Sequence, residues 1–246
     1  MEFENKFNAE IETKRIINWI KEFFDKNGPD KNCIIGISGG KDSTIIAKLL
    51  VEALGKDRVI GVTMPNGIQI DIDDSKKIID LLGIKSFNIN INNAYNGLLG
   101  ELKDIEIKED TKINLPPRLR MATLYAIAQS FNGFVVNTCN KSEDYVGYST
   151  KFGDGAGDFS PCSEYLVCEM LQIGDYLNLP KELIHKTPSD GLCGQTDEDK
   201  LGFTYNELDD YILTGKIEDE VKKEKIERLH RTNLHKMKLM PKCERN

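Results

Sequence analysis

The stretch IIGISGGKDST, residues 34–44, joins a short apolar run to a glycine-rich polar loop. The apolar run Cys33–Ile37 contains β-branched residues and is bounded by Gly39 and Gly40, which predicts a buried strand. After the loop, apolar residues recur at helical spacing as far as Leu54, which predicts a helix. A strand that passes through a glycine turn into a helix is typical of the βα unit of an α/β fold.

The same alternation of strand and helix continues along the chain. Further strands are predicted at 59–63, 87–91 and 134–136, and further helices at 16–24, 71–82, 118–131 and, within a charged tail, 216–240. The weaker pattern of residues 139–200 predicts irregular structure around a site. Strands separated by helices imply a parallel sheet with helices on both faces. We therefore expect one doubly wound, Rossmann-like α/β domain over residues 1–246.

The composition excludes several classes of protein. The 246 residues are 39% apolar and 30% charged, which is typical of a soluble globular chain. The formal net charge of −7 argues against nucleic acid as the main partner. The charged N-terminal segment has no secretory signal, no apolar run reaches the roughly 18 residues of a membrane span, and the six cysteines lack metal-binding spacing. These observations favour a cytoplasmic protein with reduced cysteines and no membrane partner.

The polar loop has the composition of a phosphate-binding site. Its glycines let the backbone approach a ligand closely, and the N–H groups at the start of a helix bind anions. Ser38, Lys41 and Ser43 add hydroxyl donors and a positive charge, whereas Asp42 requires a cation between its carboxylate and the phosphates. Because Lys41 is followed by Asp42, the loop is not a Walker A motif, and it also lacks the GxGxxG fingerprint. A structural glycine turn is the alternative interpretation.

Two further polar segments follow the predicted strand at 134–136. Residues 137–143 read NTCNKSE and lie where that strand ends, so they share the carboxyl edge of the sheet with the loop. Residues 147–161 read GYSTKFGDGAGDFSP, a glycine-rich run with a lysine and two acids. Taken alone, this run fits a site for a polar ligand and a solvated loop equally well.

These motifs together resemble a known family. The string SGGKDS is similar to the pyrophosphate-binding loop of the ATP pyrophosphatases, and the ordered motifs up to residue 236 resemble those of ammonia-dependent NAD synthetases. The resemblance implies an adenine nucleotide alpha hydrolase-like fold and a ligase that amidates deamido-NAD with ammonia, the last step of NAD biosynthesis. It also implies an adenylate intermediate, AMP and pyrophosphate as products, and ATP and Mg²⁺ as co-substrate and cofactor.

The resemblance also implies roles for individual residues. Those that would bind ATP are Gly36, Ile37, Ser38, Gly39, Gly40, Lys41, Asp42, Ser43, Thr138 and Ser189. Those that would bind deamido-NAD are Arg118, Lys151, Asp158, His235 and Lys236. Asp42 and Glu143 match the family's magnesium ligands. No general base for ammonia is assigned, since Asp42 and Asp158 are both conceivable proton acceptors.

The sequence departs from the family pattern at three places. Residues 189–191 read SDG, so that an acid is shifted by one position. Many family members carry an ATP-contacting lysine near residue 167, where this chain has Val167, and Lys41 is one candidate to supply the missing charge. Residues 234–237 read LHKM, without the glutamate and arginine that often flank the central pair. These changes affect the expected phosphate contacts rather than the reaction class.

Two other functions stay in competition. A tRNA-modifying ATP pyrophosphatase would share the loop but would need a basic face, which the acidic balance does not favour. A catalytically silent nucleotide-binding module would be favoured by loss of Asp42 or Ser43, and both are present.

The length and the family resemblance predict the nitrogen donor and the oligomeric state. Glutamine-using relatives carry a separate amidase domain, for which 246 residues leave no room, so we expect free ammonia, or ammonia from a separate protein, as the donor. The family is typically a homodimer. The apolar stripe of the first helix, at Ile16, Ile17, Ile20 and Phe23, fits either part of a dimer interface or the core.

Overall fold

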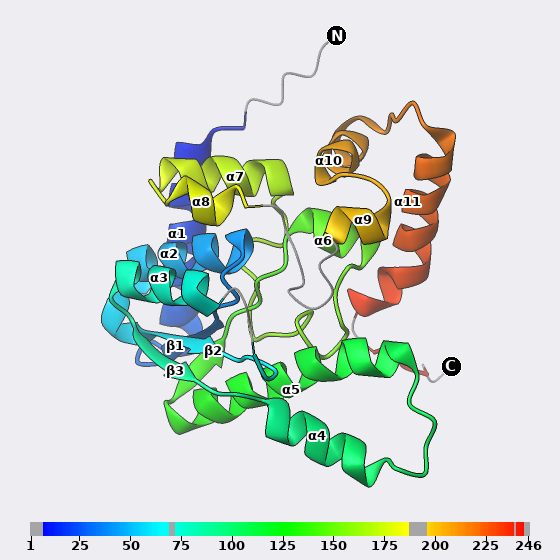
Figure 1. Cartoon of the computed structure of the whole chain (residues 1–246). Helices are drawn as coiled ribbons and strands as arrows, with labels where there is room; N and C mark the ends of the chain where they lie inside the picture. The colour runs from blue at the N-terminus through cyan, green and yellow to red at the C-terminus, as the bar shows by residue number, and fades with distance from the viewer. Residues whose placement is uncertain (1–6, 69–71, 187–195, 239, 244–246) are drawn as a thin grey trace.

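A parallel sheet lies between helical layers in the computed structural model, which describes residues 7–68, 72–186, 196–238 and 240–243 (Figure 1). The strands are β1 (Asn32–Gly36), β2 (Val59–Thr63), β3 (Lys85–Asn88) and β4 (Gly133–Val135). Their order across the sheet is β3-β2-β1-β4, and every neighbouring pair is parallel. In β1, Cys33 pairs with Val59 on one side and with Phe134 on the other. β1 is therefore a central strand with a neighbour on each side.

Successive side chains of β1 are buried in two different hydrophobic cores. Cys33 and Ile35 belong to the core on one face, and Ile34 packs on the other face with Met121 and Leu124. The helices of the first face are α1 (Ala9–Asn27), α2 (Lys41–Leu54), α3 (Ile72–Leu82), α7 (Val167–Tyr176) and α8 (Lys181–Ile184). The opposite face is covered by α5 (Glu109–Ser130). This arrangement confirms the predicted doubly wound α/β class.

A third core lies beside the sheet and is built from shorter helices (Figure 1). They are α6 (Lys141–Val146), α9 (Asp197–Leu201), α10 (Tyr205–Thr214) and α11 (Glu220–Asn233). α11 confirms the predicted charged helix in the tail. The expectation of irregular structure over 139–200 is wrong in part, because α6, α7, α8 and the start of α9 lie there. These helices have four to ten residues, which is too short for an apolar period to be recognised in the sequence.

α5 corrects the predicted helix start. We expected a helix from Arg118, behind Pro116 and Pro117, but both prolines lie inside α5. A proline has a helical φ, but inside a helix it removes one N–H donor and its ring crowds the carbonyl group four residues earlier. The carbonyl groups without a donor are those of Lys112 and Ile113, two exposed residues that water can reach. α5 is long, with 22 residues, yet no helix in the described ranges combines the length and the apolar character needed to span a bilayer.

The edge of the sheet beyond β2 is less regular than the sequence predicts. β3 ends at Asn88 rather than at Ile91, and none of its residues is fully buried. The helix α4 (Asn92–Glu101) follows it and was not predicted, because it buries no residue and so lacks an apolar stripe. A 3₁₀ turn at Lys56–Arg58 precedes β2, and another at Leu234–Lys236 follows α11.

The apolar stripe of α1 belongs mainly to the core. Ile16, Ile20 and Phe24 are at most 2% exposed and pack in the core that α1 shares with α2 and α7. Ile17 and Phe23 are partly buried against the same core. Asn8 caps the helix, since its side chain accepts a hydrogen bond from Ile11 N. Core packing therefore accounts for the stripe.

We expect Ile20→Ala to lower the free energy of unfolding by about 2–5 kcal/mol, because the side chain is fully buried and its loss leaves a cavity. Ile11→Ala lies on the same helix, where the side chain is 55% exposed, and should change that energy by less than about 0.5 kcal/mol. Urea denaturation followed by circular dichroism measures both. Small and equal effects would contradict the assignment of the stripe to the core.

Candidate active site

The loop after β1 is held in shape by its two serine side chains. Ser43 Oγ accepts a hydrogen bond from Ser38 N (3.3 Å) and donates one to the Gly40 carbonyl oxygen (3.2 Å). Ser38 Oγ accepts a hydrogen bond from Gly40 N (3.2 Å). Gly39 has a φ of +83°, and an added Cβ would lie 3.1 Å from Ser75 N, so the loop requires glycine there. Gly40 caps α2 without a side-chain hydrogen bond, which leaves the first N–H groups of the helix available to an anion.

Asn140 connects the two carboxylates that the sequence assigns to magnesium. Its Nδ2 donates to Asp42 Oδ1 (3.1 Å), and its backbone N donates to Glu143 Oε2 (3.4 Å). Its Oδ1 accepts a hydrogen bond from Glu143 N (3.0 Å) and so caps α6. Asp42 lies in the first turn of α2, behind β1, and Glu143 lies in the first turn of α6, behind β4. The adjacent strands β1 and β4 therefore bring the two acids to one edge of the sheet.

This donor set suits magnesium. Mg²⁺ prefers oxygen ligands and usually takes one or two carboxylates, with phosphate oxygens and water in its other positions. Loss of hydration, together with the charge of Asp42, raises the pKa of Glu143, as expected for two carboxylates that share a site. Within the described ranges, no three His, Cys, Asp or Glu side chains form a group suited to a metal. The pair fits a metal ion that is shared with a phosphate ligand.

Lys41 is a buried cation beside this pair. Its side chain is 6% exposed, and its Nζ lies 2.9 Å from Asp42 Oδ2. The ammonium also lies over the ring of Tyr205, 5.2 Å from the centroid. Burial disfavours the charged form, but the charges of Asp42 and Glu143 outweigh burial and raise the pKa of Lys41. Lys41 is therefore an ammonium ion that balances the two carboxylates.

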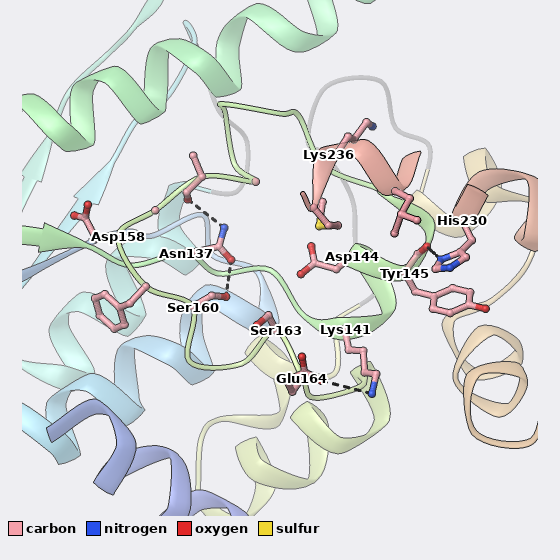
Figure 2. Close-up of a pocket in the computed structure, with 16 residues that line it drawn as sticks. Asn137, Lys141, Asp144, Tyr145, Asp158, Ser160, Ser163, Glu164, His230 and Lys236 are labelled. Atoms are coloured by element: carbon pink, nitrogen blue, oxygen red, sulfur yellow. Dashed lines mark hydrogen bonds and ion pairs between the residues drawn. The ribbon is translucent and has the colours of Figure 1, made fainter. Parts of the chain in front are cut away.

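A cavity of about 510 Å³ opens near the segment that follows β4 (Figure 2). Its walls come from that segment, from α6, and from α11 with the turn after it. Asp144 points into the cavity, and the rings of Tyr145 and His230 stack beside it with centroids 4.1 Å apart. Burial, and then the charges of Glu164 and Asp154, raise the pKa of Asp144 to about 6. The cavity is large enough for part of a nucleotide and has both acidic and basic walls.

Four of the five residues predicted to bind deamido-NAD converge around one rim of this region. Arg118 Nε of α5 donates to the Lys151 carbonyl oxygen (3.3 Å), and Lys151 Nζ donates to the His235 carbonyl oxygen (2.8 Å). Lys236 Nζ donates to the carbonyl oxygens of Gly147 (2.8 Å) and Ser149 (3.0 Å) and lines the cavity. Segments far apart in the sequence thus meet here. Their roles toward a substrate stay a prediction.

Asp158, the fifth residue, lines the same cavity but directs its carboxylate elsewhere. Its Oδ2 accepts a hydrogen bond from Val135 N (2.7 Å), and its Oδ1 accepts one from Tyr125 Oη (3.3 Å). In Figure 2 its carboxylate lies at the edge of the view, away from Lys236. The described contacts of Asp158 therefore fasten the glycine-rich segment to β4 and α5.

The structure describes only one of the two hydroxyl residues that are predicted to contact ATP. Thr138 is half-buried in the segment after β4, one residue from Asn137. Ser189 lies outside the described residues. Asn137 is a functional candidate that the sequence did not single out: its Nδ2 donates to the carbonyl oxygens of Asp154 (2.8 Å) and Ala156 (3.1 Å). Asn137 therefore shapes the glycine-rich segment that lines the cavity.

Asp209 is a second residue that the sequence analysis missed. It is 2% exposed on α10, and its carboxylate accepts hydrogen bonds from the Ser142 hydroxyl and from Cys168 N (2.8 Å). Ser142 Oγ also accepts one from Val167 N (3.0 Å). The network fixes the start of α6, next to Glu143, against α7 and α10. The signal in the sequence was an acid on the apolar face of a helix, four residues after Tyr205.

Comparisons with known proteins agree on one family. The family model described as NAD synthase matches residues 12–245. A curated relative from Alkaliphilus metalliredigens, named NH(3)-dependent NAD(+) synthetase, is 37% identical over 242 residues, which cover 94% of this chain and 97% of the relative.

Solved structures give the same fold with two different names. The NMN synthetase from Francisella tularensis superposes with a TM-score of 0.89 at 36% identity, covering 97% of this chain and 99% of that one. The NH3-dependent NAD synthetase from Campylobacter jejuni superposes with a TM-score of 0.79 at 26% identity, covering 96% of this chain and 100% of that one. The same fold therefore occurs in proteins that are named for two different products, NMN and NAD.

We expect Asp209→Ala to lower the free energy of unfolding by about 2–4 kcal/mol, because it leaves a buried hydroxyl and a buried N–H without their charged acceptor. The neighbouring Asp210→Ala removes the same charge from an exposed position and should cost less than about 0.5 kcal/mol. Chemical denaturation compares the two variants. An equally small loss for both would show that the network does not hold α6 in place.

Proposed function

Because the chain belongs to the NAD synthase family, we propose that it activates the nicotinate carboxylate of deamido-NAD with ATP and then joins ammonia to it. The observation that carries this proposal is the Asn140 link between Asp42 at the phosphate loop and Glu143 in α6, the helix that follows the neighbouring strand β4. It supports a site where the phosphates of ATP and a metal ion lie at one sheet edge. The larger cavity then receives the nicotinate nucleotide.

We propose two chemical steps. In the first, a carboxylate oxygen of deamido-NAD attacks the α-phosphorus of ATP, the bond to the β-phosphate oxygen breaks, and pyrophosphate leaves. In the second, ammonia attacks the carbonyl carbon of the acyl adenylate and AMP leaves, giving NAD. The first step needs positioning and charge neutralisation more than covalent help from the protein.

The residues of the chain divide between these tasks. Loop residues Gly36–Ser43 hold the phosphates through backbone N–H groups and the hydroxyls of Ser38 and Ser43. Asp42 and Glu143 would hold Mg²⁺, which supplies charge neutralisation at the phosphates. Arg118, Lys151, His235 and Lys236 form the rim that receives the dinucleotide, with Asp158 bracing the segment behind it.

Proton removal from ammonium is assigned to no single residue. Asp42 is committed to the metal in this scheme, and Asp158 is hydrogen-bonded to the backbone of β4. Asp144 is a third carboxylate at the cavity, and its pKa of about 6 suits proton transfer near neutral pH.

A second candidate function follows from the similar Francisella protein, which is named NMN synthetase. Nicotinate mononucleotide carries the same reacting carboxylate as deamido-NAD and lacks the AMP half. The same two steps on that acid would yield NMN, with ATP and ammonia used in the same way.

We further propose that the protein is a homodimer that uses α4, the start of α5 and the turn between them as its interface. Leu98, Ile105 and Ile113 are 40%, 60% and 53% exposed there, and α4 buries no residue within the chain. Two copies that meet at this surface would cover these apolar groups. The described cysteines are free thiols, consistent with the reducing cytoplasm, which we propose as the location.

We expect Asp42→Ala to reduce pyrophosphate release at least about a hundredfold while the fold stays intact, because the phosphates lose their metal ligand. Asp57→Ala, at an exposed position just beyond the far end of α2, is the matched control and should keep normal turnover. A coupled pyrophosphate assay with circular dichroism makes the comparison. Normal pyrophosphate release by folded Asp42→Ala would overturn the metal assignment.

The acid substrate and the nitrogen donor are tested in one experiment. Purified protein receives ATP and Mg²⁺ with deamido-NAD or nicotinate mononucleotide, and with ammonium or glutamine as the nitrogen source. We expect kcat/KM to be at least about tenfold higher for deamido-NAD, and activity with ammonium only. A reversed preference would establish the second candidate function, and equal use of glutamine would contradict ammonia as the donor.

Ile113→Asp places a charge in the proposed interface and should convert the dimer to a monomer in analytical ultracentrifugation. Ile11→Asp, at an exposed apolar position on α1, should leave the dimer unchanged. A monomeric unmodified protein at micromolar concentration would refute the dimer itself.

A further inference from the structure

Lys41 holds a position that the proposed reaction leaves unexplained. Its side chain is buried, and its ammonium is paired with Asp42 Oδ2 at 2.9 Å. The charges of Glu143 and Asp197 act on it as well. A buried ammonium is stable only when nearby anions compensate for its lost hydration. In the absence of a ligand, Lys41 is therefore the counter-ion of the carboxylates at this sheet edge.

The same carboxylates are the proposed ligands of Mg²⁺. A magnesium ion bound to Asp42 would approach its oxygens to about 2.0–2.1 Å. The Lys41 ammonium already lies 2.9 Å from one of those oxygens, so a bound dication would repel it at short range. Lys41 and the metal ion thus compete for one carboxylate.

A second cavity offers the ammonium another position. It has a volume of about 180 Å³, and Lys41, Val167 and Tyr205 are among its lining residues. The Tyr205 hydroxyl is buried and has no hydrogen-bond partner among the described residues. Val167 gives the cavity an apolar wall, and the charged side chains of Lys186 and Glu198 line it as well. The cavity therefore offers space to the Lys41 ammonium, and the Tyr205 hydroxyl oxygen is able to accept a hydrogen bond from it.

We propose that Lys41 is a displaceable counter-ion, which pairs with Asp42 in the ligand-free protein and, when Mg²⁺ and ATP bind, leaves that carboxylate for the space of the cavity that it already lines beside Tyr205. Lys41 is also the first residue of the helix behind the phosphate loop, so the displaced ammonium would stay near the loop and pair with the phosphates that leave as pyrophosphate. The proposal deepens the proposed function and rests on the metal pair Asp42 and Glu143.

The test measures two affinities that should move in opposite directions in Lys41→Met. Binding of Mn²⁺ to the free protein, followed by electron paramagnetic resonance, should become at least about tenfold tighter because a competing positive charge is gone. Binding of inorganic pyrophosphate with Mg²⁺, followed by calorimetry, should become about tenfold weaker because a cation is missing. Lys48→Met removes the same charge farther along α2, where Lys48 pairs with Glu52, and should change neither affinity.

Each other outcome overturns the proposal. Weaker binding of both ligands would make Lys41 a structural support, and weaker pyrophosphate binding with unchanged Mn²⁺ binding would make it a fixed phosphate ligand. Where Lys41→Met does not fold, Lys41→Gln provides the second variant, and Mn²⁺ should raise its melting temperature more than that of the unmodified protein. No larger increase would contradict displacement.

The unmodified protein separates this proposal from the function itself. If it binds Mn²⁺ and makes NAD while Lys41→Met shows no gain in Mn²⁺ affinity, only the displacement is wrong. If the unmodified protein binds no Mn²⁺ and releases no pyrophosphate, then the metal pair, the proposed function and the displacement of Lys41 are all wrong.

Discussion

The pairing of β1 with β4 is the constraint on which the rest of the site depends. Asn32, Cys33 and Ile34 pair in register with residues 133–135, so two segments about a hundred residues apart end at the same sheet edge. The chain leaves β1 toward β2 on one side and returns through β4 on the other. Ligand sites of open α/β sheets lie at such a change of direction, because two loops diverge there and leave a crevice.

The fold class was predictable because its determinants are local. The strands β1 and β2 contain short apolar runs, and the glycine loop separates β1 from α2 within a few residues. The predicted elements are wrong where exposure to solvent or tertiary contacts decide the structure instead of the local sequence. Two prolines inside α5 are tolerated because the carbonyls that they leave unpaired face water, and α4 has no buried face that a pattern would reveal.

The sequence singled out the two acids that the fold brings together, Asp42 and Glu143, but not the residues that support them. Asp42 and Glu143 stand in recognisable motifs, so the sequence indicates them without any knowledge of their partners. Asn140 and Asp209 act through hydrogen bonds to residues 98 and 67 positions away, and no spacing rule connects such pairs. The Lys41 ammonium is held by the Tyr205 ring and by nearby carboxylates, and the sequence does not reveal that these groups surround it.

The three separate cores have a consequence for how ligands act on stability. Asp42 stands on a helix of the sheet layers, whereas Glu143 stands on α6, whose Val146 belongs to the third core. The carboxylate pair therefore spans two hydrophobic cores, and separately packed units of this kind can open locally with different free energies. A ligand that needs both acids binds only when the units are docked, and its binding energy adds to their docking. Hydrogen exchange in α9 and α10 is then a sensitive reporter of an occupied site, although neither helix lines the larger cavity.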